Sequence, residues 1–436
     1  MTLLSAARDA LATGPLCDAC LGRLFADRSF GLTNDDRGHS LRVAVALEDD
    51  EPFEDPDEEC WVCEGECARY DWWAENAAAA VRGYEFATYQ VGTRVPPLIE
   101  ENDLLLREEA GLDEDAGELL KSEFNREVGK RFGGLTDTEV DFGRPDIMLH
   151  CDLTTDEVEV QVNSAFVYGR YRKLKRDIPQ TKWPCRDCNG TGRQRDELCD
   201  GCDGTGYRYD ESVEQLTAPV VEEAMDGASG TFHGAGREDV DALMLGSGRP
   251  FVIEIEDPHV RDVDTDQLQA DINDFADGKA EVEGLRLATH EMVERVKEHD
   301  ASKTYRMDVA LDDPVDQETF EAALAELDGA TIYQDTPQRV DHRRASKTRT
   351  RAVYGIDGTV DGDTAELEVH GEGGLYVKEL VSSDEGRTEP SLAGLLGVGA
   401  EVTALDVLDV EGEDEPFADE EFFRDTGEQP LDDDVN

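Results

Sequence analysis

Eight of the ten cysteines form four Cys-x-x-Cys pairs, a spacing that structural metal sites use. Two residues between thiolates let both sulfur atoms of a tight turn face one tetrahedral ion, and two such turns complete a four-thiolate site. The pairs therefore predict one or two structural zinc sites, with no open position for a catalytic water. The predicted metal ligands are Cys17, Cys20, Cys60, Cys63, Cys185, Cys188, Cys199 and Cys202.

The two groups of cysteines differ in the strength of their pattern. In the second group, CRDCNGTG and CDGCDGTG form a direct repeat with ten residues between the two pairs, whereas the first group has a gap of 39 residues. Cys67 is a spare thiol near the first group and could replace one of its ligands. A redox role would need only one pair beside a βαβ unit, and four pairs fit it poorly. Cys151 lies in an apolar stretch and is interpreted as a core residue.

Two basic clusters stand out, YGRYRKLKR at 168–176 and RVDHRRASKTRTR at 339–351. Cations beside aromatic rings suit looped or single-stranded RNA, because cations hold phosphates and rings stack on bases. The alternative is an internal network of ion pairs with the surrounding carboxylates. Two clusters in one chain favour RNA. The predicted RNA-binding residues are Arg170, Arg172, Lys173, Lys175, Arg339, Arg343, Arg344, Lys347, Arg349 and Arg351.

The composition is strongly acidic, with 103 acidic against 42 basic residues and a net charge of −61. Only ten of the basic residues are lysines. Acid excess with scarce lysine indicates a protein that works in concentrated salt, where the Debye length is about 3 Å at 1 M. The charge therefore does not exclude a nucleic-acid partner. A disordered acidic chain is excluded by the 39% hydrophobic content and by the periodic segments.

The sequence gives no sign of a membrane protein. No run approaches the roughly 18 apolar residues that a membrane span needs, and the N-terminal MTLLSAARDALATG lacks the basic start of a signal peptide. We therefore expect a cytoplasmic protein. In that reducing compartment cysteines are metal ligands or free thiols rather than disulfides.

The elements that must position these residues are read from hydrophobic periodicity. Residues 146–171 alternate as two strands would. Helices are predicted at 118–132, 213–227, 265–277, 288–299 and 316–328. Further strands are predicted at 250–257, 303–312, 330–336, 349–358, 364–371 and 375–382. Strands and helices mixed without a βαβ rhythm favour an α+β fold with a mostly antiparallel sheet. No Gly-x-Gly-x-x-Gly opens a helix after a strand, so no organic cofactor is expected.

Four motifs, taken together, resemble a known family. They are GAGREDVDALMLGSGRPF at 234–251, KTY at 303–305, QRVDHRRASKTRTRAV at 338–353 and GLYVKELVSSDEGRTEPSLAGLLG at 374–397. Their order and spacing resemble the archaeal and eukaryotic tRNA pseudouridine synthases that act on uridines 54 and 55 of the TΨC arm. The resemblance extends over most of residues 210–410. The N-terminal cysteine pairs and QVNSAFVYGRYRKLKRDIPQTKW look like the accessory region of that family.

The resemblance implies a domain organisation. Residues 1–176 would form an accessory RNA-binding region with an α/β fold, a zinc site and a THUMP-like domain at about 40–170. Residues 177–210 would be a zinc-knuckle insert, 211–410 the catalytic domain with a mostly antiparallel mixed sheet, and 411–436 an acidic tail. The partner would be tRNA, and the protein would act as a monomer.

The resemblance also implies site residues. Asp239 would be the catalytic carboxylate, which adds to the nucleotide or acts through a glycal intermediate, and Lys378 would be the cation that keeps it ionised. Tyr305 would stack on the everted uracil, Tyr376 would line the same pocket, and Arg237 would hold the displaced strand. The glycines around the loop would let RNA backbone approach closely.

Other interpretations remain open. Asp239 could be a turn-capping carboxylate, Asp241 is a competing candidate, and the two tyrosines could be plain strand residues. The repeat at 185–206 also resembles the zinc region of DnaJ-type co-chaperones, although no His-Pro-Asp motif occurs. A non-catalytic zinc protein that binds tRNA, and another THUMP-bearing tRNA enzyme such as a methyltransferase, are therefore the rival functions. The sequence leaves open whether uridine 54, uridine 55 or both are modified.

Overall fold

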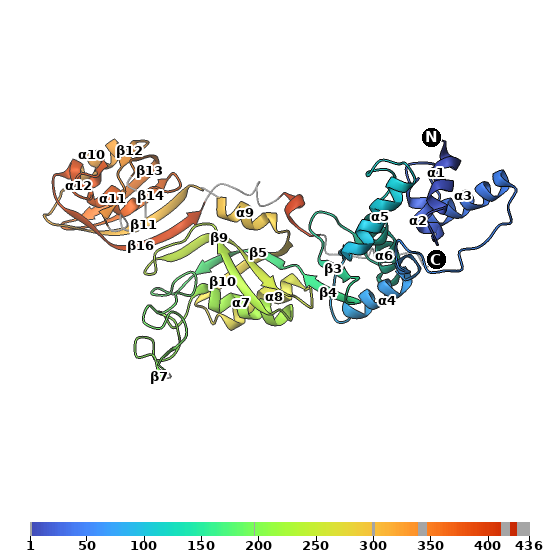
Figure 1. The fold of residues 1–436 in the computed structure, drawn as a ribbon. Helices are drawn as coiled ribbons and strands as arrows, with labels where there is room; N and C mark the ends of the chain where they lie inside the picture. Colours follow the sequence, from blue (N-terminus) through green and yellow to red (C-terminus); the bar gives the residue numbers. More distant parts are fainter. Residues whose placement is uncertain (1, 196, 299–300, 339–346, 411–418, 425–436) are drawn as a thin grey trace, which may run out of the picture. The chain divides into compact units, whose positions relative to one another are not determined.

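The computed structural model describes residues 2–195, 197–298, 301–338, 347–410 and 419–424. The chain divides into two compact units, Met1–Asn163 and Ser164–Asn436 (Figure 1). Each unit has its own sheet and its own core.

The first unit combines helices with a small sheet. Its helices are α1 (Leu3–Leu11), α2 (Asp18–Arg23), α3 (Asn34–Asp49), η1 (Glu66–Ala68), α4 (Tyr70–Ala80), α5 (Pro97–Glu109) and α6 (Leu120–Thr136). Its strands are β1 (Thr88–Arg94), β2 (Glu139–Val140), β3 (Ile147–Asp152) and β4 (Glu157–Val162). The strand order is β2-β1-β3-β4; β1 is parallel to both β2 and β3, and β4 is antiparallel to β3.

Helix α6 shows why this unit folds as it does. Phe124, Val128 and Phe132 recur every four residues, so they share one face of the helix, and all three are buried. That face packs against β1 and α4, where the Trp73 ring meets Phe124 edge to face at 5.7 Å. The predicted helix at 118–132 is thus confirmed.

The second unit is built on a ten-stranded sheet. Its strands are β5 (Ala165–Lys173), β8 (Ser229–Gly234), β9 (Leu243–Glu256), β10 (Ala280–Ala288), β11 (Lys303–Leu311), β12 (Thr331–Gln334), β13 (Arg349–Asp361), β14 (Thr364–Gly371), β15 (Thr388–Glu389) and β16 (Ala400–Val410). Their order is β10-β5-β9-β16-β11-β14-β13-β12-β15, and β8 pairs with β9. Among the described strands of this sheet only the β9–β16 pair is parallel, so the predicted mixed, mostly antiparallel sheet is confirmed.

The helices on this sheet belong to two larger cores and to one smaller cluster, which contains α9. The helices are α7 (Val213–Ala224), α8 (Thr265–Phe275), α9 (Glu291–Glu298), α10 (Gln317–Leu327), α11 (Val377–Ser382), α12 (Leu392–Leu396) and η3 (Glu420–Phe422). Helices α7 and α8 lie with β5, β9 and β10, and α10, α11 and α12 lie with β11 to β14 (Figure 1). Tyr305 of β11 packs against both cores, at the junction between them.

Two sequence predictions differ from the structure. The sequence predicts a strand at 375–382, but Val377–Ser382 form α11, because Val377, Leu380 and Val381 have the spacing of a helix face and are buried on it. The first unit ends at Asn163 rather than at 176, because β5 pairs with β9 and β10 in the second sheet. Most of the acidic tail lies outside the described residues.

Among the described residues, no helix has both the length and the apolar composition needed to cross a bilayer.

Candidate active site

Asp239 lies in the loop at 235–242 that joins β8 to β9. Further along the chain, in β9, two glycines adopt a left-handed conformation: Gly246 with φ +58° and Gly248 with φ +74°. A Cβ atom would lie 1.8 Å from the carbonyl oxygen of Leu408 at the first position and 2.8 Å from that of Tyr171 at the second. These two glycines therefore let β9 pass close to neighbouring protein strands, and the expectation that they make room for RNA is wrong.

A buried lysine binds the backbone of this loop. Lys173, the last residue of β5, is fully buried. Its ammonium donates hydrogen bonds of 3.0 Å to the carbonyl oxygens of Ile178, Asp239 and Val240. An ammonium has three N–H donors, and these carbonyls use all of them. The prediction that Lys173 binds RNA is wrong, because its ammonium is enclosed and cannot reach a phosphate.

The residue before Asp239 is also anchored. Glu238 is buried, accepts a hydrogen bond of 2.8 Å from the Tyr171 hydroxyl, and lies 3.1 Å from Arg249 Nε and 3.9 Å from Lys173 Nζ. Arg249 in turn donates 2.8 Å to the carbonyl oxygen of Ala235. Burial lowers the pKa of Lys173, and the charge of Glu238 opposes that shift. Buried charges of both signs thus fix the loop on either side of the aspartate.

The carboxylate of Asp239 faces a cation. Lys378, on α11, places its ammonium 2.9 Å from Asp239 Oδ2 and 3.8 Å from Asp241 Oδ2. The side chain of Asp239 is 44% exposed and that of Asp241 is 66% exposed. Of the two competing aspartates, Asp239 is therefore the nearer to the cation and the more enclosed.

The ion pair lies in a pocket of about 350 Å³. Asp239, Tyr305, Tyr376 and Lys378 all line it, together with Arg237 from the same loop as the aspartate. The structure thus brings together the five residues that the sequence resemblance singled out, from a loop, β11 and the start of α11. A volume of this size lies within the range of small-molecule sites, about 300–1,000 Å³.

Tyr305 presents a neutral phenol to this pocket. Burial raises the pKa of Tyr305 to about 12; nearby Arg249 acts in the opposite direction, and the charge of Asp239 adds a smaller upward shift. The hydroxyl is therefore protonated at neutral pH and can donate a hydrogen bond, while the ring offers a stacking surface. It is not a base at that pH.

Tyr376 is fixed through its backbone. The side chain of buried Gln334 accepts a hydrogen bond from Tyr376 N and donates one to Tyr376 O, both of 2.9 Å. The guanidinium of Arg349 lies 5.6 Å from the centre of the Tyr376 ring. The second basic cluster therefore reaches the pocket through Arg349.

The other residues of that cluster are only partly described. Arg339, Arg343 and Arg344 lie outside the described residues. Arg351 lies 3.4 Å from Glu372, and Lys347 accepts through its carbonyl oxygen a hydrogen bond of 3.2 Å from Thr336. RNA binding by this segment stays a prediction.

The first basic cluster has protein partners. Its contacts match the internal network that was the alternative interpretation, and RNA binding by Arg170, Arg172 and Lys175 stays a prediction. Arg170 donates to the carbonyl oxygens of Ser247 and Gly248, Arg172 pairs with Glu281 and Glu283, and Lys175 pairs with Glu211 at 2.7 Å.

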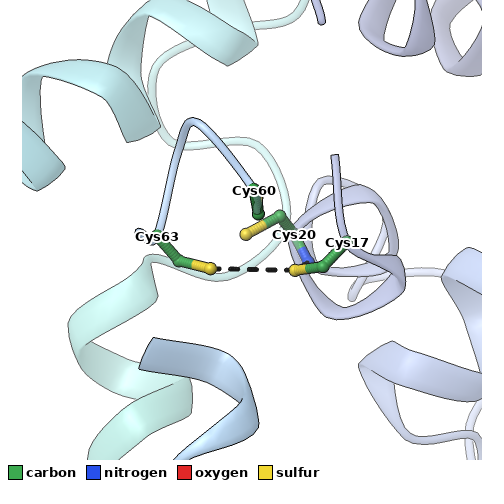
Figure 2. Close-up of side chains that lie close together, drawn as sticks. All are labelled: Cys17, Cys20, Cys60 and Cys63. Atoms are coloured by element: carbon green, nitrogen blue, oxygen red, sulfur yellow. Dashed lines mark hydrogen bonds between the residues drawn. The ribbon is translucent and has the colours of Figure 1, made fainter. Parts of the chain in front are cut away.

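The first cysteine cluster lies in the first unit. Cys17 and Cys20 flank the start of α2, and the side chains of Cys60 and Cys63 approach them (Figure 2). Their sulfur atoms all lie within 4.8 Å of one another, with Cys17 and Cys63 at 3.8 Å. None of the cysteines is in a disulfide. This cluster could hold one metal ion.

The second cluster closes the insert of the second unit. Cys185, Cys188, Cys199 and Cys202 also bring their sulfur atoms within 4.8 Å of one another. They surround a short hairpin of β6 (Arg193–Gln194) and β7 (Glu197–Leu198). The amides of Gly192 and Gly206 donate to the sulfur atoms of Cys188 and Cys202 at 3.3 and 3.2 Å. Such donors stabilise thiolates, so this cluster also fits a metal ion.

The two remaining cysteines behave differently. Cys67 lies 3.9 Å from Cys20, at the edge of the first cluster, and accepts a contact of 3.6 Å from Arg23. Cys151 is fully buried in β3, and burial raises the pKa of its thiol to about 12. The interpretation of Cys151 as a core residue is confirmed.

Comparison with known proteins agrees with this architecture. Residues 166–411 match the family described as "Pus10, C-terminal", and residues 73–152 match "Pus10 THUMP domain, archaeal". A protein of Halorubrum lacusprofundi named "tRNA pseudouridine synthase Pus10" is 68% identical, over 97% of this chain and 100% of the relative. A protein of the same name from Methanothrix thermoacetophila is 41% identical, over 94% of this chain and 95% of the relative.

The matched domains and the named relatives identify a THUMP-containing protein of the pseudouridine synthase class. The chain belongs to the Pus10 family.

Proposed function

We propose that this protein converts uridine to pseudouridine at position 54, position 55 or both in the TΨC arm of tRNA, with Asp239 as its catalytic residue. The observation that carries the proposal is the 2.9 Å pair of Asp239 and Lys378 in a pocket that Tyr305 and Tyr376 also line. Membership of a family whose relatives are named tRNA pseudouridine synthases supports the reaction and the substrate. A co-chaperone would share only the cysteine repeat.

The pocket can support this isomerisation. The Asp239 carboxylate attacks C1′ of the ribose, or removes the proton from C2′ to give a glycal, and the C1′–N1 bond breaks with its electrons on uracil. The released ring turns and forms a bond from C5 to C1′. On the first path this bond displaces the carboxylate; on the second, the protonated Asp239 returns its proton to C2′ as the bond forms. C5 then loses its proton and N1 gains one, so no redox partner is needed. The Tyr305 ring holds the loose uracil by stacking, and Lys378 is the counter-ion of the carboxylate.

The test uses an unmodified tRNA transcript with the protein in molar potassium chloride, followed by chemical mapping of pseudouridine. We expect modification at position 54, at position 55 or at both. Transcripts with cytidine at position 54 or at position 55 decide between these cases, because a substituted position cannot be isomerised. A map with no pseudouridine at either position in the parent transcript contradicts the proposal.

We further propose that each cysteine cluster holds a structural zinc ion. Zn–S bonds of about 2.3 Å at the tetrahedral angle place sulfur atoms about 3.8 Å apart. The pairs Cys17–Cys63 and Cys188–Cys202 are 3.8 and 3.7 Å apart. Zinc would cross-link each pair of turns, and four thiolates leave no position for a catalytic water.

Removal of one cluster should release one metal ion. Cys199→Ser is expected to lower the zinc content from two ions to one per chain, because three thiolates and a hydroxyl bind zinc far more weakly. Elemental analysis measures the content. Cys151→Ser is the matched control, since it changes a buried thiol outside both clusters and should keep two ions. Two ions in the Cys199→Ser protein would refute a zinc site in the insert.

A further inference from the structure

The insert carries a group of side chains that the mechanism does not use. The two ends of the insert pair with each other: Arg208 N donates a hydrogen bond of 2.9 Å to Trp183 O, and Pro184 forms a β-bridge with Tyr207. We call these paired residues the neck of the insert. The second cysteine cluster begins one residue further on, and Cys185 N donates 2.8 Å to Gly206 O. A metal ion in the cluster would therefore hold this neck closed.

The neck reaches the candidate active site through stacked side chains. The Arg208 guanidinium lies 5.7 Å from the centre of the Trp183 ring and 5.5 Å from that of Tyr209. The two rings meet edge to face at 5.5 Å. Arg237, which lines the pocket, lies 5.8 Å from the same Trp183 ring. The row Arg237–Trp183–Arg208–Tyr209, called the neck row below, thus runs from the pocket onto the insert.

In the part of the chain that the structure describes, the two arginines of the neck row are not used in ion pairs. Both are exposed, and within the described residues neither has a carboxylate within 4.0 Å. Arg172 and Arg249, in contrast, each pair with glutamate. A guanidinium ordered against an aromatic ring loses little freedom on binding, and its planar fork suits a phosphate. Because these two guanidinium groups are exposed and have no carboxylate partner among the described residues, their N–H donors are available to bind a polyanion.

We propose that the neck row binds the phosphates of nucleotides that flank the target uridine, with Arg208 and Arg237 as the ligands and Trp183 as the ring that orders both. This inference rests on the proposed function, because it takes the RNA substrate of the same pocket. It gives the insert a role: the metal knuckle positions Trp183 and Arg208 beside the pocket. The tRNA would then be held on the insert side as well as at the basic segment near Tyr376.

The test measures the Kd of the full-length protein for an unmodified tRNA transcript over a series of potassium chloride concentrations. Arg208→Ala is expected to weaken binding about tenfold. It should also reduce the slope of log K against log salt by about 0.7–0.9, the loss of one phosphate contact. Arg208→Lys should keep the slope, because it keeps the charge, and should still weaken binding, because it loses the planar fork.

Arg286→Ala is the matched control. Arg286 also stacks on an aromatic ring, Phe423, at 3.5 Å, but it pairs with Glu420 at 2.6 Å and does not line the pocket. Its loss should leave the Kd and the slope unchanged. If Arg208→Ala binds tRNA like Arg286→Ala, the inference is wrong, and that is also the result expected if the row docks another protein. Pseudouridine formation by the wild type is scored separately, so that an inactive wild type counts against the proposed function and not against this surface.

Discussion

Asp239→Asn is expected to reduce the single-turnover rate of pseudouridine formation at least about 10⁴-fold. The amide keeps the shape of the side chain, but it can neither attack C1′ nor take the proton from C2′. The measurement is the yield of pseudouridine with time at saturating enzyme. The Kd for tRNA should change little, because the substitution removes only one negative charge and the basic residues around the pocket remain.

Asp241→Asn is the control for this change. Asp241 is two residues away, is more exposed, and lies 3.8 Å from the same ammonium. It shares the charge environment of Asp239 but is farther from Lys378. Its loss is expected to change the rate less than about threefold. An active Asp239→Asn protein together with a silent Asp241→Asn protein would transfer the catalytic role to Asp241.

The sequence was most informative where one short motif contains the whole feature. The four cysteine pairs predicted both clusters, because each pair builds its own turn and the order of the pairs along the chain already divides them into two groups. The Arg-Glu-Asp triplet and Lys378 were found through several motifs with fixed order, and the structure places Asp239 and Lys378 2.9 Å apart. In the first case the spacing within each pair carries the information, and in the second the order of several motifs along the chain carries it.

The sequence was least informative about which charges are buried. Lys173 stands in a basic run with Arg172 and Lys175. Its environment comes from Ile178 and from the loop of Asp239, which meet only when β5 joins the sheet. Burial of a lysine is rare enough that an exposed role is the natural prediction.

Tertiary contacts also determine the helical conformation of α11 and the assembly of the neck row, which the sequence alone did not predict. The segment 375–382 alternates like a strand over its first residues, and the burial of Leu380 and Val381 together favours the helix instead. Trp183 and Arg208 are 25 positions apart, and the cysteines between them bring the two together. Strands β8, β10 and β16 were not predicted, since each is short in apolar residues or interrupted by charges.

Lys173→Met is expected to lower the single-turnover rate about 100-fold, an effect that a misplacement of about 1 Å can produce. Methionine fills a similar volume but removes one hydrogen-bond donor from each of the carbonyl oxygens of Asp239, Val240 and Ile178. Glu238 also loses one of its two cations. The loop should then relax, and the Asp239 carboxylate should no longer be held against Lys378.

A purely structural role for Lys173 predicts something different. Breaking a buried ion pair typically costs about 3–5 kcal/mol, so unfolding by denaturant should become easier in either case. A lysine that also positions the loop must in addition slow the chemical step in protein that is fully folded, with the Kd for tRNA nearly unchanged. Lys279→Met is the matched control, because Lys279 is partly exposed, pairs with Glu211 and lies far along the chain from the loop. If folded Lys173→Met protein reacts at the rate of Lys279→Met, Lys173 stabilises the unit without positioning Asp239, and the other contacts of the loop, such as those of Arg249 and Gln180, must set its geometry.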